Sequence, residues 1–321
     1  MKKLQGILCI LISLLCLLSG FSNPIQVFRI RKVGTSPNFI ALSPDGKKVF
    51  ATSYGTNELM GISLDRKMVT QSVLVGSSPL GLAIDDKGDT ALVACKDSGT
   101  VAVVDLKTFR VVADINIGGQ PNFVAMSHRG YRACVSNYGH SGQGLLHIVD
   151  IRERSVVASI KMGVSPFGLV VSPTSEMVYV AMGGNNEVWV VDLERQVVVN
   201  KIAVGEAPDG IAITPDGKRV FVANSRSNDL SVIDTDLMRV QFTVPVGKMP
   251  FGVAVSPDGK RIFVVNAGSR NVSIFASDLH NLVAETFAVD RGPTDIKIAL
   301  DNRTVYVINE MSNTLVVADI P

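Results

Sequence analysis

The chain has 321 residues, of which 46% are hydrophobic, and it carries 31 Lys and Arg against 29 Asp and Glu. This length supports one closed domain with a sizeable core. The nearly neutral charge balance argues against broad electrostatic attraction to nucleic acid or to anionic membranes, and leaves only a local basic patch open.

Residues 1–22 have the pattern of a bacterial secretory signal peptide. Two lysines precede an apolar run over residues 7–18, and a small-x-small pattern at residues 20–22 offers a cleavage site. Loss of these two of the 31 basic residues would leave 29, equal to the 29 acidic residues. A retained anchor would need a longer run, and a lipoprotein attached through Cys16 is disfavoured by the bulky Leu15. We expect a periplasmic or extracellular protein with no membrane span after cleavage.

A repeat of about 42 residues fills the remainder of the chain, and such a period fixes the architecture before any single motif does. The copies start near residues 33, 75, 117, 162, 204, 246 and 289. Each has a proline at the same place, namely Pro37, Pro79, Pro121, Pro166, Pro208, Pro250 and Pro293. Three residues before it stands a glycine, except in the last copy, where Asp290 replaces it.

Each copy is predicted to form four short strands. A TPDGK or SPDGK turn separates the first two, because Pro presets φ and Gly accepts a positive φ. The second strand is a nearly continuous apolar run, which indicates burial on both faces. In the clearest copy the four strands are expected at residues 210–213, 220–223, 230–234 and 239–246.

Four antiparallel strands repeated radially predict an all-β fold, a seven-bladed β-propeller over residues 23–321. The last copy stops after its third strand, at residues 319–321. Residues 26–33 can supply the missing strand, which would leave no open sheet edge. The apolar residues of that segment fall one position out of phase with the other copies, so a bulge is expected near Arg31 and Lys32.

Three segments carry a recognisable strand-and-loop signature: FVANSRSNDLSVID from Phe221, VYVAMGGNNEVWVVD from Val178 and VYVINEMSNTLVVAD from Val305. With the flanking P-x-G and SPDGK elements, they resemble the YVTN-repeat β-propellers, including the secreted YncE-like proteins, over essentially the whole mature chain. The resemblance implies the fold. It leaves function open, because related propellers resemble surface-layer components, nucleic-acid or protein binders and the propeller domains of haem d1 and amine-oxidising redox proteins.

Ligands of propellers are expected at one mouth of the central channel, where two sets of positions converge. The residues after the prolines are Asn38, Leu80, Asn122, Phe167, Asp209, Phe251 and Thr294, and the second strands end at Ser53, Cys95, Asn137, Met182, Asn224, Asn266 and Asn309. The recurrent asparagines are interpreted as partners of loop backbone groups. The predicted ligand- or partner-binding residues are Asn38, Tyr54, Asn122, Tyr138, His140, Phe167, Asp209, Arg226, Phe251 and Glu310.

The third copy departs most from the others, since its loop over residues 137–144 carries a three-residue insertion. This loop is either a recognition element or a tolerated insertion. His140 is the one histidine expected at the mouth, because His128 and His280 belong to the opposite face and His147 to a third strand. Cys95 and Cys134 are interpreted as two buried thiols, with a disulfide less favoured. Trp189 is expected in the core.

No nucleophile elbow, catalytic triad order or clustered His/Cys site is present in the sequence, so no catalytic residue and no metal ligand are predicted. The leading hypothesis is a secreted, monomeric, non-enzymatic propeller that binds a protein or small ligand at the channel mouth, with the cofactor unknown and none expected. One alternative is a periplasmic redox or hydrolytic propeller with a noncovalent cofactor, either haem d1-like or a metal. Another is a nucleic-acid-binding propeller.

Overall fold

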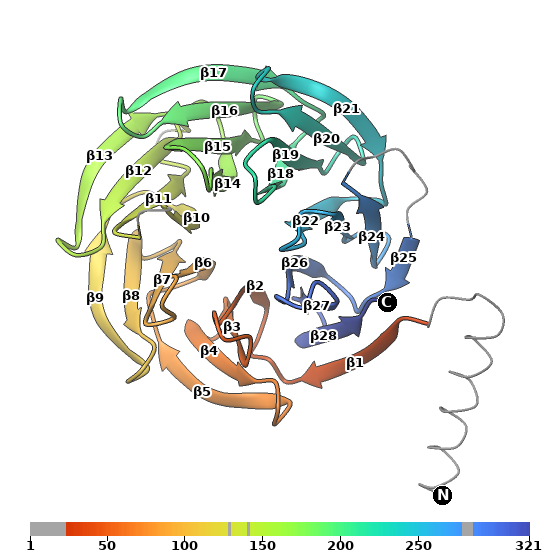
Figure 1. Cartoon of the computed structure of the whole chain (residues 1–321). Helices are drawn as coiled ribbons and strands as arrows, with labels where there is room; N and C mark the ends of the chain where they lie inside the picture. Colours follow the sequence, from red (N-terminus) through yellow and green to blue (C-terminus); the bar gives the residue numbers. More distant parts are fainter. Residues whose placement is uncertain (1–23, 128–129, 140–141, 278–284) are drawn as a thin grey trace, which may run out of the picture.

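The computed structural model describes residues 24–127, 130–139, 142–277 and 285–321. Within them the strands form seven four-stranded antiparallel sheets arranged as a ring (Figure 1). The predicted all-β, seven-bladed propeller is thereby confirmed. The predicted signal peptide and His128, His140 and His280 lie outside the described residues. No helix in the described part of the chain is long and apolar enough to cross a membrane.

Each of blades one to six consists of consecutive strands, ordered from the channel outward. Blades one to three contain β2 (Pro37–Leu42), β3 (Lys48–Ser53), β4 (Glu58–Ser63), β5 (Met68–Leu74), β6 (Pro79–Ile84), β7 (Thr90–Cys95), β8 (Thr100–Asp105), β9 (Arg110–Asn116), β10 (Pro121–Met126), β11 (Arg132–Asn137), β12 (Leu145–Asp150) and β13 (Ser155–Lys161). Blades four to six contain β14 (Pro166–Val171), β15 (Met177–Met182), β16 (Glu187–Asp192), β17 (Val197–Ala203), β18 (Pro208–Ile213), β19 (Arg219–Asn224), β20 (Asp229–Asp234), β21 (Arg239–Pro245), β22 (Pro250–Val255), β23 (Arg261–Asn266), β24 (Asn271–Ala276) and β25 (Glu285–Ala288).

Blade seven closes the ring with the two ends of the chain. Its inner strands are β26 (Pro293–Ile298), β27 (Thr304–Asn309) and β28 (Thr314–Asp319), and its outer strand is β1 (Gln26–Arg31). β1 pairs antiparallel with β28, and Ile30 lies opposite Leu315 with only 1% of its surface exposed. In Figure 1, β1 lies along β28 near the C-terminus. β1 therefore covers the edge of β28 that would otherwise be unpaired.

The expected irregularity in β1 lies just beyond the strand. The ladder runs without a shift as far as Arg31, which is paired with Thr314. Ile30 is four residues before Gly34, whereas the buried Ile160 of blade three is three residues before its own glycine. Lys32 accommodates the additional residue with a left-handed φ of 60°. The predicted bulge is thus replaced by a left-handed residue at the strand end.

Local chemistry in the turns explains why the repeat carries its S/TPDGK signature. In blade five the hydroxyl of Thr214 and the backbone N–H of Lys218 both donate to the carboxylate of Asp216, and these hydrogen bonds lower the pKa of Asp216. Gly217 follows with φ +72°. A Cβ there would also lie 2.5 Å from the Thr174 hydroxyl of the preceding blade. Glycine is therefore required at this turn for both its φ and its size.

The core lies between neighbouring blades. The second strands are buried on both faces as predicted: Val220, Phe221 and Val222 of β19 are fully buried. Phe221 packs in one cluster with Val253 and Val264 of the next blade. Cys95 and Cys134 are buried free thiols, and burial raises their pKa values to about 11 and about 12. Stacking of like faces around the ring thus accounts for most of the recurring residues.

Candidate ligand site at the channel mouth

The prolines of the repeat are the first residues of the seven inner strands, which surround the central channel (Figure 1). At one end of this channel lies a cavity of about 560 Å³. Six of the seven residues that follow the prolines line it: Asn38, Leu80, Phe167, Asp209, Phe251 and Thr294. The seventh, Asn122, is buried and donates from its side-chain amide to the carbonyl of Gln120.

In five blades the second residue after the proline also lines the cavity, namely Phe39, Phe123, Gly210, Gly252 and Asp295. Every pairing of an inner strand with its neighbour is irregular just after the proline. In blade one the register shifts between Pro37 and Ile40, and the other six blades shift at the same place. Such a bulge breaks the alternation of side chains between faces. Asn38 and Phe39 consequently both line the cavity. None of these second-position residues is among the binding residues predicted from the sequence.

Aromatic side chains at the second position form a wall of the cavity. Phe39 of blade one and Phe123 of blade three meet edge to face across blade two, with ring centroids 4.5 Å apart. Phe123 continues to Phe167 at 5.8 Å, and Tyr138 lies 6.2 Å from Phe167. The triplet Pro-Asn-Phe, shared by residues 37–39 and 121–123, was the available sequence signal. These rings give the cavity a rigid apolar side.

Glycines occupy the second position in blades two, four, five and six, at Gly81, Gly168, Gly210 and Gly252. A Cβ on Gly168 would overlap the carbonyl oxygen of Asp209, and one on Gly210 would overlap that of Phe251. The starts of β14, β18 and β22 are therefore in backbone contact. This contact places Phe167, Asp209 and Phe251 side by side in the wall.

The carboxyl of Asp209 has no hydrogen bond or ion pair among the described residues. It lines the cavity from blade five and is only partly exposed. Loss of solvent contact disfavours its charged form and raises its pKa to about 8. Burial also raises the pKa of the Tyr138 hydroxyl, and the negative charge of Asp209 adds to this effect. The carboxyl is thus held without a compensating charge.

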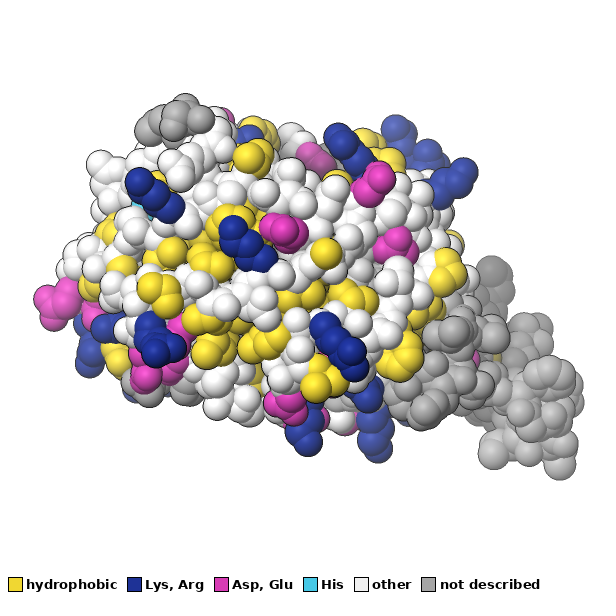
Figure 2. Space-filling view, turned by 90° about the horizontal axis from the view of Figure 1, so that it is seen from above, with side chains coloured by type: hydrophobic (Ala, Val, Ile, Leu, Met, Phe, Trp, Pro, Cys, Tyr) yellow, Lys and Arg dark blue, Asp and Glu magenta, His cyan; other side chains and the backbone are white. Residues whose placement is uncertain are grey.

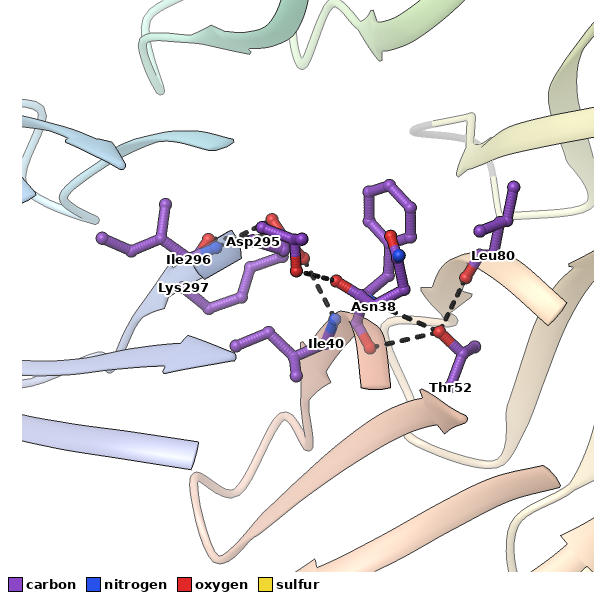
Figure 3. Close-up of polar contacts among 9 residues, drawn as sticks. Asn38, Ile40, Thr52, Leu80, Asp295, Ile296 and Lys297 are labelled. Atoms are coloured by element: carbon purple, nitrogen blue, oxygen red, sulfur yellow. Dashed lines mark hydrogen bonds and ion pairs between the residues drawn. The ribbon is translucent and has the colours of Figure 1, made fainter. Parts of the chain in front are cut away.

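The carboxylate of Asp295 also lines the cavity, and its hydrogen bond joins blade seven to blade one (Figure 3). It accepts a hydrogen bond of 3.0 Å from the backbone N–H of Ile40 and forms an ion pair of 2.9 Å with Lys297. The neighbouring Thr294 hydroxyl donates to the carbonyl of Asn38. This carboxylate therefore serves the closure of the ring at the channel.

A comparable bridge joins blades one and two. The hydroxyl of Thr52, fully buried in β3, accepts from the backbone N–H of Phe39 at 3.1 Å and donates to the carbonyl of Leu80 at 2.9 Å (Figure 3). Ser136 makes the same pair of contacts, with Phe123 and with the carbonyl of Phe167. These hydrogen bonds fix the backbone positions of Phe39 and Phe123.

The rim of the cavity carries charged and methionine side chains from loops of blades six and seven. These are Met249, Arg270, Arg291, Glu310 and Met311. Arg270 and Arg291 are exposed and pair with no described carboxylate. On one side of the ring, basic and acidic side chains alternate among apolar ones (Figure 2).

The other predicted site residues are dispersed. Tyr138 packs on Phe167 beside the cavity, whereas Tyr54 and the exposed Arg226 are not among the described residues that line it. The ends of the second strands are fully buried, and Asn137 there accepts from the backbone N–H groups of Gln120 and Gly139. The described residues of the blade-three loop are not part of the lining, most of which comes from blades five to seven.

Histidine and tryptophan are structural where the structure describes them. His147 is buried in β12, contacts Asn137 and Ser159, and has a pKa lowered by burial. Trp189 is 8% exposed, and its N–H donates to Glu187. The described residues contain no group of three or more His, Cys, Asp or Glu side chains that could hold a metal ion.

Three solved structures share this architecture. Hydrazine synthase of Kuenenia stuttgartiensis matches with a TM-score of 0.80 and 21% identity, covering 88% of this chain and 95% of that one. A functionally unknown protein from Desulfotomaculum acetoxidans DSM 771 matches with a TM-score of 0.72 and 17% identity, covering 82% of this chain and 90% of that one. The β-propeller domain of Myceliophteria thermophila Cps50 (Swd1) matches with a TM-score of 0.77 and 11% identity, covering 93% of this chain and 100% of that one. At these identities the likeness shows the fold alone.

No curated protein matches the chain. Residues 170–321, from β14 onward, match the family model described as YNCE-like beta-propeller. The same strand pattern continues through the blades that precede this segment, and β1 completes the ring. Residues 170–321 are thus similar to the YncE-like β-propellers, and they form part of a closed ring of seven blades.

Proposed function

We propose that this chain is a secreted, non-enzymatic propeller that binds a ligand at the channel mouth, either a small molecule or a side chain inserted by a partner. The cavity of about 560 Å³ carries this proposal. Its volume is typical of ligand sites, and its lining combines apolar and aromatic walls with a few convergent polar groups. Secretion rests on the leader sequence of residues 1–22, which predicts a periplasmic or extracellular location.

Neutral aromatic probes test the cavity directly. Indole and 2-naphthol are expected to bind saturably, with a Kd of about 1 mM or tighter, because the walls offer apolar and ring contacts. Phe251→Ala should weaken this binding by about tenfold, through the loss of buried apolar contact. Phe242→Ala is the matched control, since that ring is 51% exposed on outer strand β21. Saturation-transfer NMR measures both variants, and equal binding by both would refute the site.

Single-stranded nucleic acid is a second candidate, favoured by clustered arginines. Arg29, Arg31, Arg270 and Arg291 surround a hollow of about 370 Å³ beside the cavity. Arg29 forms an ion pair with Asp290, but no described carboxylate pairs with Arg270 or Arg291. Such a cluster can contact successive phosphates.

Labelled oligothymidylate is expected to bind with an affinity that falls as salt rises from about 50 to about 200 mM. Replacing both Arg270 and Arg291 by Ala should weaken binding by at least about tenfold, because two phosphate contacts are lost. The control replaces Arg110 and Arg195, which are exposed on other blades. Fluorescence anisotropy measures the affinities. Absence of binding, or binding that ignores salt, would dismiss this candidate and leave the cavity proposal untouched.

A further inference from the structure

The wall of the channel around Asp209 has an unusual order of side chains. Phe167 precedes Asp209 and Phe251 follows it at the same position of neighbouring blades, and all three line the cavity. Glycines beside them allow the three inner strands to touch, so the order is fixed by backbone contact. A carboxyl therefore stands between two aromatic rings at the mouth of a closed ring.

Within the part of the chain that the structure describes, no basic side chain neutralises this carboxyl. Lys297 is committed to Asp295 at 2.9 Å, and no described basic side chain forms an ion pair with Asp209. Tyr138 is close enough for the charge of Asp209 to raise the pKa of its hydroxyl. The further charged groups that face the cavity are Arg270, Arg291, Glu310, Asp295 and Lys297. A partly desolvated carboxylate without a partner is unfavourable, and a bound cation would relieve that penalty.

We propose that the channel mouth binds organic ammonium compounds, with the ammonium group against the carboxylate of Asp209 and the apolar body against the phenylalanine rings. Ring faces attract ammonium groups electrostatically, and this attraction grows when water is excluded. The carboxylate supplies the counter-charge, and each N–H of the ammonium group can donate a hydrogen bond to it. This inference rests on the proposed ligand site and names the chemistry of its ligand.

The chemistry of the wall disfavours other ligand classes at this point. An anionic group would meet the Asp209 carboxylate, and the rim arginines that could attract it belong to blades six and seven. A hard metal ion needs several oxygen ligands, and no group of three acidic, His or Cys side chains is assembled in the described part of the chain. The carboxylate of Asp209, between the rings of Phe167 and Phe251, can instead bind one compact cationic group that carries an apolar tail.

A matched pair of ligands tests the proposal: 2-phenylethylamine, which is cationic, and 2-phenylethanol, which is neutral and of similar shape. The wild-type protein is expected to bind the amine at least about tenfold more tightly than the alcohol at pH 8. Asp209→Asn should abolish this preference by lowering the affinity for the amine at least about tenfold. Isothermal titration calorimetry measures all four combinations, and thermal unfolding verifies that the variant is folded.

The dependence on pH gives a second readout. Because the ammonium group binds the ionised carboxyl, whose pKa is about 8 in the free protein, affinity for the amine should fall at least about tenfold between pH 8 and pH 6. Affinity for the alcohol should not change. Equal binding of amine and alcohol, or an unchanged amine affinity in Asp209→Asn, would overturn the ammonium proposal while retaining the ligand site. Failure of both ligands to bind would overturn both proposals.

Discussion

A protein that lacks residues 24–33 is expected to lose at least about 4 kcal/mol of its free energy of unfolding and to aggregate. The deletion removes strand β1 with the buried Ile30 and Val33, and so removes core contacts and a row of ladder hydrogen bonds. It also exposes the edge of β28, which can then pair with other chains. Chemical denaturation and size-exclusion chromatography measure the two effects.

Point variants within β1 test how much of this loss of stability comes from the packing of a single buried side chain. Ile30→Ala should cost about 2–5 kcal/mol because its side chain is 1% exposed. Phe28→Ala is the control in the same strand, since its ring is 38% exposed, and it should cost about 1 kcal/mol or less. If the truncated protein unfolds like the full chain, the ring does not depend on the shared blade.

Asp209→Asn is expected to stabilise the protein above neutral pH, by about 2 kcal/mol at pH 9. Burial raises the pKa of Asp209 from 3.8 to about 8 in the folded state. Between these values the folded protein binds a proton that the unfolded chain has released, so wild-type stability falls as pH rises from about 4 to about 8. The full shift would correspond to a larger energy, which solvent contact with the partly exposed side chain reduces.

The amide does not titrate, so the variant should match the wild type at pH 4 and exceed it increasingly up to pH 8. Denaturant unfolding of both proteins at several pH values gives the comparison. Asp86→Asn removes the same charge from an exposed turn and should change stability by no more than about 0.5 kcal/mol at any of them. A wild-type advantage at pH 9 would show that Asp209 has a partner that compensates its charge.

Ring closure was predictable from sequence, but its details were not. The missing fourth strand of the last copy and the free segment of residues 26–33 indicated the shared blade. Asp290, in place of the repeat glycine, had no explanation at that level. Its carboxylate accepts from Arg29 at 2.8 Å and from the Thr314 hydroxyl at 2.8 Å. Although burial opposes the effect, these hydrogen bonds lower its pKa. The exception in the repeat is thus a contact between the two ends of the chain.

The candidate site was predicted in part. The position after each proline was expected at the mouth, and the structure brings Asn38, Phe167, Asp209 and Phe251 to one cavity. Phe39 was missed because strict alternation of a strand would turn it away from the channel. The bulge after each proline breaks that alternation, and a bulge is a property of the paired strands rather than of one segment.

The sequence by itself determined the seven blades, the turns and the buried second strands, because these depend on a short-range pattern of apolar residues, proline and glycine that recurs about every 42 residues. The tertiary structure decided which side chains share the cavity and which charges remain uncompensated. Asp209 and Asp295 have the same chemistry and both face the channel, yet only Asp295 has Lys297 and the N–H of Ile40 within bonding distance. That difference arises from contacts between residues as far apart in the chain as 40 and 295, which no local pattern records.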